Sequence, residues 1–351
     1  MNSMNYSNST RTLFLFIFAA ATAFFAPSVK SQAQIVRLDS LNLQVRGDYQ
    51  HESVDGEELR DANGFKGKFF NFIMRARIGD KMTFSYRQRI NKTNINYSFF
   101  DATDWLTLDY KFTDQFSMAA GKQIVGIGGY EYDKAPIDVY YASEYWNNIR
   151  PYQWGVSATF GLRGGKDSFM AQFCQSPFRG EGQDTYAYNV MWMGNHGVWK
   201  TLWSVNAIEY AQGKFIGYVA LGNAFDLGRF HLELDFMNRT VEGEPVFFRD
   251  CSVMGELAYR PTSKLTLLAK ATYDVNKANH AGDFCIQPGT EITRVGAGAE
   301  FYPLGNRTLR LHANGAYTFG HNGNPAGTLQ DKHLFLDCGI TWNVNLLRLT
   351  K

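Results

Sequence analysis

FFNFIMRARIGDKMTFSYRQRIN, residues 69–91, is the stretch that decides the fold. Successive side chains of a β-strand point to opposite faces, so a strand between two environments alternates with a period of two. The stretch alternates in this way on both sides of a turn at residues 79–81, which predicts an antiparallel hairpin with Ile78 opposite Met82. One face is apolar and unusually aromatic, and the other carries the arginines Arg75, Arg77, Arg87 and Arg89. We interpret the aromatic face as suited to lipid and the arginine face as suited to water.

The same alternation continues through the rest of the chain without a convincing helical pattern. Residues 265–273, for example, read LTLLAKATY, with apolar side chains on one face and Thr266 and Lys270 on the other. Short turns alternate with longer polar loops, as they do in outer-membrane barrels. The mean hydropathy of -0.29 excludes a bundle of transmembrane helices. We therefore predict an all-β fold, a transmembrane antiparallel β-barrel of about sixteen strands that can enclose an aqueous channel.

The first 33 residues have the character of a secretory signal peptide. Arg11 precedes an apolar run at residues 13–25, and small residues at 31–33 precede a predicted cleavage site before Gln34. We predict a signal peptide at 1–33 and a barrel domain at 34–351 in the bacterial outer membrane. Removing the peptide takes away Arg11 and Lys30 and lowers the formal net charge from +2 to zero, so overall charge does not indicate a partner.

The cysteines are scattered without the paired spacing of a zinc or redox motif, at Cys174, Cys251, Cys285 and Cys338. Cys251 and Cys285 fall near two loops that we expect on the same side of the sheet, so either a disulfide or isolated thiols fit the sequence. No basic and aromatic patch of a nucleic-acid-binding protein stands out. We predict no metal, no cofactor and no nucleic acid.

Several motifs lie between residues 121 and 156: Gly121-Lys122-Gln123, the glycine-rich residues 126–131, Ser143-Glu144-Tyr145 and Arg150-Pro151-Tyr152-Gln153-Trp154-Gly155-Val156. With these motifs the chain resembles the phosphate-selective porin O and P family in its Bacteroidetes form, most strongly over residues 115–160. The resemblance implies a sixteen-stranded, often trimeric outer-membrane channel. Its third extracellular loop, here residues 124–151, would fold into the pore. The resemblance also implies a ladder of pore arginines with a central lysine, for which Lys122 is the candidate.

The predicted pore-lining and anion-binding residues are Arg46, Arg75, Arg77, Arg87, Arg89 and Lys122. Guanidinium groups offer forked donors to phosphate and carboxylate oxygens, and rings of Arg or Lys are used by anion pores. The alternative is that these arginines pair with acids of the lumen and brace the wall. The acids considered for that role are Asp48, Asp109, Glu233, Asp235 and Glu256.

The predicted constriction-loop residues are Glu131, Asp133, Lys134, Asp138, Glu144 and Arg150. Mixed charge at a narrowing would set both the size and the charge of the solutes that pass. The alternative is an extracellular lid that never enters the lumen.

Two other classes of function compete with a channel. His51-Glu52-Ser53 has the His and Ser spacing of an outer-membrane phospholipase, although it lies at a loop edge. His280 and Asp283 lie near Cys285 in a late loop, where exposure of polar residues to solvent explains them better than catalysis or metal binding does. A non-conducting adhesion or assembly barrel is the other class. We predict instead a porin without enzymatic activity, surrounded by outer-membrane lipid and able to form a homotrimer. Small hydrophilic solutes, with anions such as phosphate favoured, would diffuse through it.

Overall fold

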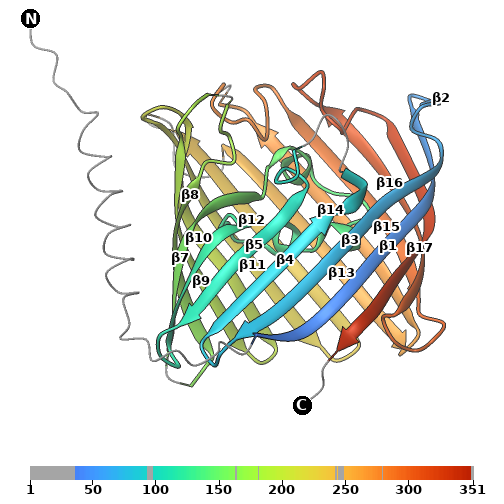
Figure 1. Cartoon of the computed structure of the whole chain (residues 1–351). Helices are drawn as coiled ribbons and strands as arrows, with labels where there is room; N and C mark the ends of the chain where they lie inside the picture. Colours follow the sequence, from blue (N-terminus) through green and yellow to red (C-terminus); the bar gives the residue numbers. More distant parts are fainter. Residues whose placement is uncertain are drawn as a thin grey trace, which may run out of the picture. The chain divides into compact units, whose positions relative to one another are not determined.

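The computed structural model describes residues 36–92, 98–162, 164–180, 182–241, 243, 249–278 and 280–348. The predicted signal peptide lies outside the described residues. The described chain forms one antiparallel sheet of 17 strands that closes into a barrel, because β1 pairs with both β17 and β3 (Figure 1). One of these strands, β2, has only two residues, so sixteen long strands form the wall, as predicted.

The strands are β1 (Val36–Val54), β2 (Glu57–Glu58), β3 (Gly64–Ile78), β4 (Met82–Arg89), β5 (Thr103–Lys111), β6 (Phe116–Ile124), β7 (Tyr152–Gly161), β8 (Asp167–Gln175), β9 (Tyr186–His196), β10 (Trp199–Ala211), β11 (Lys214–Leu227), β12 (Phe230–Val241), β13 (Asp250–Thr262), β14 (Leu265–Asn276), β15 (Glu291–Phe301), β16 (Leu309–His321) and β17 (His333–Arg348). The helical segments are η1 (Ile90–Lys92), α2 (Tyr130–Asp133), η2 (Pro136–Asp138) and α3 (Glu144–Asn148). None of these helices is long and apolar enough to cross a membrane.

The hairpin of β3 and β4 has the predicted register. Ile78 lies opposite Met82, and the next inward pair matches Arg77 with Thr83. Because side chains alternate, this single pairing places the arginines of both strands on one face.

The two faces of the barrel wall differ sharply in polarity. On the outer face Val205, Leu311 and Trp342 are 63%, 41% and 52% exposed. On the inner face Arg46 and Asn206 are buried. A water-soluble sandwich would bury its apolar row, whereas a membrane barrel turns that row toward lipid and keeps polar groups inside.

Short turns and long loops segregate to opposite ends of the barrel (Figure 1). β10 and β11 are an exception, since only residues 212–213 join them at the end that carries the long loops. The connection between β6 and β7, residues 125–151, is the third at that end and is called the infolded loop below.

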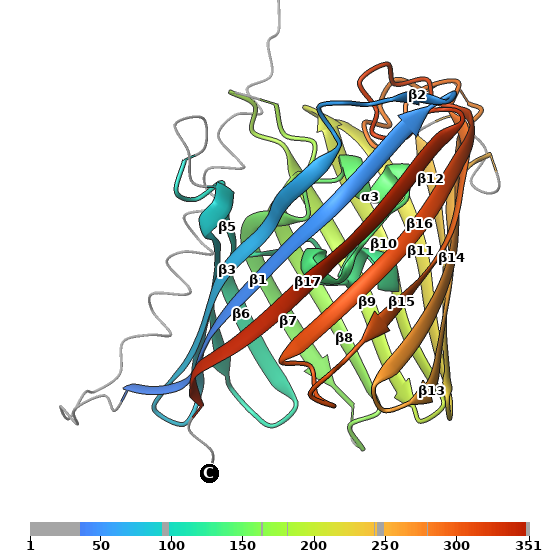
Figure 2. The ribbon, with the colours of Figure 1, turned by 90° about the vertical axis from the view of Figure 1, so that its right-hand side faces the viewer.

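The infolded loop runs inside the barrel, with α3 visible through the wall in Figure 2. Its side chains Val125, Ile127 and Tyr132 are buried in one cluster with Ile208 and Tyr218 of the barrel wall. The predicted infolded third loop is therefore confirmed, and it starts one residue later than expected because Ile124 still belongs to β6.

All four cysteines are free thiols, and only Cys338 is exposed. Cys251 and Cys285 are not bridged, so the isolated-thiol interpretation of the sequence holds.

Candidate functional site: the lumen and its infolded loop

A chain of ion pairs holds the infolded loop against β12, β13 and β14. The ammonium group of Lys134 lies 2.6 Å from Glu233 and 2.5 Å from Glu256. Lys270 lies 2.7 Å from Glu131 of the loop and 3.8 Å from Glu256. The loop therefore contributes one base and one acid to a continuous series of ion pairs, and the wall contributes two acids and one base. These five side chains are called the anchoring chain below.

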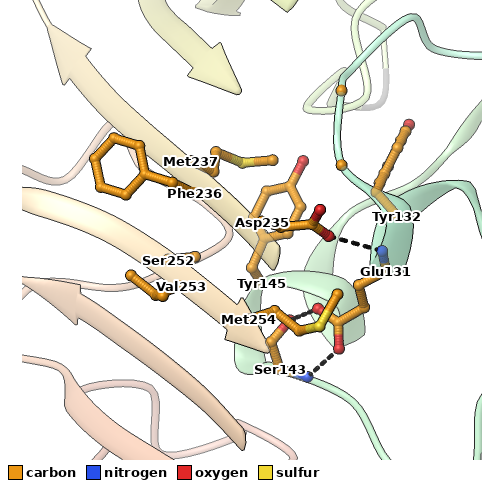
Figure 3. Close-up of a pocket in the computed structure, with 12 residues that line it drawn as sticks. Glu131, Tyr132, Ser143, Tyr145, Asp235, Phe236, Met237, Ser252, Val253 and Met254 are labelled. Carbon is orange, nitrogen blue, oxygen red and sulfur yellow. Dashed lines mark hydrogen bonds between the residues drawn. The ribbon is translucent and has the colours of Figure 1, made fainter. Parts of the chain in front are cut away.

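Backbone and side chain of α2 are both fixed at this wall (Figure 3). The N–H groups of Tyr130 and Glu131 donate to the Asp235 carboxylate at 2.9 and 2.8 Å. The Glu131 carboxylate accepts hydrogen bonds from Ser143 further along the loop. The space left between α2 and the wall at this point is a cavity of only ≈ 20 Å³. Burial would raise the pKa of Glu131, but the Lys270 ammonium and the Ser143 bonds hold it below its ordinary value.

Two arginines attach the tip of the loop to the far side of the wall. Arg46 of β1 donates from Nη1 to the carbonyl oxygens of Ile137 and Val139, each at 3.1 Å. Arg310 of β16 donates to Asp138 at 2.6 Å and to the Ile137 carbonyl at 3.1 Å. The tip therefore reaches across to the seam at which the barrel closes.

The glycine cluster of the infolded loop allows direct contact with the strands beneath it. A Cβ on Gly128 would lie 2.4 Å from the carbonyl oxygen of Leu202 in β10. The Gly128 N–H also donates to Ser204 at 2.8 Å. Any larger residue at 128 would lift the loop from the wall, which explains physically why the sequence has glycine there.

Glu144 ties the loop to the extracellular loops that cover it. Its carboxylate accepts from the Leu329 N–H at 3.1 Å and from Asn148 at 2.8 Å. Its own N–H donates to Asp274 of β14 at 2.8 Å. Glu144 and Leu329 are fully buried, so this end of the loop is a packed plug and does not move freely.

The open part of the lumen lies between the infolded loop and β3 to β6. A space of ≈ 720 Å³ is bounded there by Asp133 and Ala135 of the loop. The opposite side consists of Arg75, Arg87, Thr83, Ser85, Thr107, Asp109 and Gln123. We identify this space as the candidate narrowing of the pore.

Four of the five predicted pore arginines are paired with acids. Arg46 bridges Asp48 and Asp337, Arg77 pairs with Asp39, and Arg87 and Arg89 share Asp104 at 2.6 and 2.8 Å. Arg87 also lies over the Trp105 ring, with its guanidinium carbon 3.7 Å from the centroid. Wall bracing therefore accounts for these four side chains, although the acids are mostly other than those expected from the sequence.

Arg75 differs from the other four. It is exposed to the ≈ 720 Å³ space and forms no ion pair or hydrogen bond with a residue that the structure describes. Asp133 of the infolded loop and Asp109 of β5 bound the same space. Within the described residues, the narrowing thus combines the unpaired Arg75 guanidinium with the Asp109 carboxylate on the same wall and the Asp133 carboxylate across the opening.

Lys122 does not reach the lumen, contrary to the prediction. In β6 it pairs with Leu106 and Trp154, which lie on the outer face, while its neighbour Gln123 lines the narrowing. Its ammonium group donates to the carbonyl oxygen of Phe100. The physical reason is alternation, since Lys122 and Gln123 must point to opposite sides of the wall.

Lys68 is an inward cation that the sequence analysis missed. Its ammonium group donates to Gln50 of the inner wall at 2.9 Å. Simple alternation from Phe70 would have placed it outside, but the pairing of β1 with β3 shifts between Arg46 and Gly47. A β-bulge of this kind moves a side chain from the outer to the inner face of the wall, and the sequence gives no clear signal of it.

The constriction-loop residues separate into two groups. Glu131, Lys134, Asp138 and Glu144 are engaged in holding the loop in place. Asp133 faces the narrowing, and Arg150 lies in a different depression at the extracellular end. Lys270 stood on a predicted polar face, but nothing in the sequence showed that it or Arg310 would meet the loop.

Asp48, His312 and Asp337 bring three metal-ligand atoms within 4.8 Å of one another. The Nη2 atom of Arg46 lies 2.7 Å from Asp48 and 3.2 Å from Asp337, so a guanidinium already balances both carboxylates. A metal ion would have to displace the arginine that holds the loop tip. We therefore assign this cluster to anchoring.

A closed barrel with an apolar outer face, a polar inner face and a partly open lumen is an outer-membrane channel. Residues 40–198 match the family described as phosphate-selective porin O and P, which confirms the resemblance seen in the sequence motifs. The fold and this match place the protein in the bacterial outer membrane. No curated protein matches the chain significantly.

Solved porins share the fold at low sequence identity. An anion-selective porin from Comamonas acidovorans superposes with a TM-score of 0.65 at 11% identity, covering 88% of this chain and 100% of that one. The outer-membrane channel DcaP of Acinetobacter baumannii gives 0.63 at 11% identity, covering 91% and 100%. The outer-membrane protein OmpT of Vibrio cholerae gives 0.60 at 12% identity, covering 90% and 99%.

Proposed function

We propose that the channel favours small anions, such as phosphate, over cations during passive diffusion, and that Arg75 carries this preference. The observation that supports the proposal is the unpaired guanidinium of Arg75 at the narrowing. Each of the other four arginines has a carboxylate within ion-pair distance, although Arg87 and Arg89 share one, so each contributes less net field than the unpaired Arg75. An arginine can hold a phosphate or carboxylate through two parallel hydrogen bonds.

The expected size of the preference follows from Coulomb's law. A unit charge 4 Å away stabilises an anion by about 1 kcal/mol in bulk water and about 4 kcal/mol near a protein surface. Asp133 and Asp109 bound the same space and reduce this field. We therefore expect a moderate anion preference, about fivefold to tenfold, and not strict exclusion of cations.

Reversal potentials in planar bilayers test the proposal. In a potassium chloride gradient the channel should favour chloride, and Arg75→Gln should abolish most of this preference while the conductance stays measurable. Arg229→Gln, on an exposed turn at the opposite end from the long loops, is the matched control. A channel that prefers potassium, or an Arg75→Gln variant with unchanged reversal potential, would refute the assignment. Replacing chloride with phosphate then measures the preference between anions.

We further propose that residues 1–33 are removed on export and that the mature barrel forms a homotrimer. The composition of the N-terminal segment and the family resemblance support these proposals. N-terminal sequencing of the membrane form should begin at Gln34, and light scattering in detergent should give three chains per particle.

The phospholipase alternative has no support in the local geometry. His51 contacts Asn63 at 3.3 Å, and Glu52 lies 2.9 Å from His333. Among the described residues His51 has no hydrogen bond to Ser53, which a nucleophile activated by its base would require.

A further inference from the structure

A second large depression opens at the extracellular end, apart from the narrowing. It has a volume of ≈ 720 Å³ and shares no lining residue with the space around Arg75. Its walls come from the end of the infolded loop, from the loop between β8 and β9, from the β10–β11 hairpin and from the loop between β14 and β15. These four segments are distant in sequence and come together around this depression.

Aromatic rings form one part of the lining of this depression. The rings of Phe178 and Phe284 have centroids 5.7 Å apart, and Tyr210 lies 6.4 Å from Phe284 and 5.8 Å from His280. Phe284 is 47% exposed although it sits in a hollow. An exposed aromatic cluster in a concave site presents ring faces and edges to a planar ligand.

The charged side chains in the lining are Arg150, Arg179 and Lys214. None forms an ion pair with a described residue, and the described lining contains no acid. Arg179 donates from Nε to the Gln183 carbonyl oxygen at 2.7 Å, which fixes its direction and leaves its two terminal nitrogens available. Three cations that have no ion-pair partner among the described residues, beside an aromatic surface, create a site of positive potential.

His280 adds an oriented hydrogen-bond donor. The Gly282 N–H donates to its Nδ1 atom at 2.8 Å, so the neutral ring carries its proton on Nε2. A polar group of a ligand can accept a hydrogen bond from this N–H group.

The depression faces the interior of the barrel mouth and not the bilayer. Lys214 stands on the same face of β11 as Ile216 and Tyr218, which are buried against the infolded loop, whereas its neighbour Phe215 lies on the outer face at 39% exposure. A ligand therefore enters from the aqueous medium, so a lipid chain is not the expected occupant.

We propose that this depression is a binding site for an anion that carries a flat apolar ring, such as an aromatic carboxylate. The carboxylate meets Arg179 and Lys214, and the ring lies against Phe178 and Phe284. A bare inorganic anion satisfies only the cations, and a neutral aromatic satisfies only the rings, so each binds more weakly than the combined ligand. The site is independent of the anion preference assigned to Arg75.

Calorimetry on the full barrel in detergent tests the proposal with three probes: benzoate, inorganic phosphate and benzyl alcohol. Benzoate should bind about tenfold more tightly than either of the other two. Arg179→Gln with Lys214→Gln should weaken benzoate by about tenfold or more, and Phe284→Ala should weaken benzoate without changing phosphate. Folding of each variant is checked by the heat-dependent mobility shift of the barrel on a gel.

Arg229→Gln, on the exposed turn at the opposite end of the barrel, is the matched control and should leave both the benzoate affinity and the reversal potential unchanged. Equal affinities for phosphate and benzoate would show an electrostatic surface without the aromatic component and would overturn the proposal. No binding of benzoate, or a folded Arg179→Gln, Lys214→Gln variant with wild-type affinity, would overturn it as well. Failure of the pore assignment appears only in the reversal potential, so the two results are distinguishable.

Discussion

Replacing Lys134 with glutamine should loosen the infolded loop. Lys134 bridges Glu233 and Glu256 at 2.6 and 2.5 Å, and its side chain is 21% exposed against 8% and 19% for the two acids. Removing one partner of a fully buried pair costs about 3–5 kcal/mol, whereas an exposed pair contributes about 0–1 kcal/mol. Because the burial of these side chains is intermediate, we expect Lys134→Gln to make docking of the loop less favourable by about 2 kcal/mol.

A loss of about 2 kcal/mol raises the undocked population of the loop about 30-fold. Single-channel recording should show this as increased open-channel noise and more frequent current steps. Hydrogen exchange should accelerate at residues 130–138 and not in the strands. Lys277→Gln breaks a pair with Glu291 in which both side chains are at least half exposed, so it is the control and should change neither signal. Wild-type noise together with wild-type exchange in Lys134→Gln would refute the anchoring argument.

Three further changes test other parts of the structure. Gly128→Ala should cost the docked loop about 1–3 kcal/mol, because its Cβ would meet the Leu202 carbonyl at 2.4 Å, and faster exchange at 125–133 measures this. Val205→Arg places a charge on the lipid face and should lower the free energy of unfolding by about 2–4 kcal/mol in urea titrations from vesicles, with Val205→Ala as the control. Glu131 has a lowered pKa, so its contribution to docking is complete above its ordinary value of 4.5 and is lost as the pH falls through the lower value of the docked state. Channel noise should therefore rise as the pH falls below 4.5, and Glu131→Gln should be noisy already at neutral pH.

The pattern of alternating residues was sufficient to predict the barrel. An inward side chain must be compatible with water and an outward one with lipid. The alternation within each strand therefore shows which of its faces points toward the lumen. The hairpin register at Ile78 and Met82 followed from the turn between them. The infolded loop was expected only from the family resemblance. The structure shows how its glycines permit it, because a chain segment that lies directly on strands needs residues without side chains.

The pairing of charges could not be predicted, because ion pairs form between strands and loops that lie far apart in the sequence. Arg46 meets Asp337 across the seam, and Lys134 meets Glu256 across the lumen. Only these distances show that four of the pore arginines are paired with acids and that Arg75 faces the narrowing without a partner among the described residues.

Local irregularity limited the assignment of individual lysines. Lys122 was predicted from the family resemblance alone, yet the strand turns this side chain outward, and a bulge turns Lys68 inward. The sequence by itself determined which surface meets lipid and which meets water, since that depends on a period within each strand. The tertiary structure alone decided which charges remain free, since a net field depends on distances between charges that only the closed barrel sets.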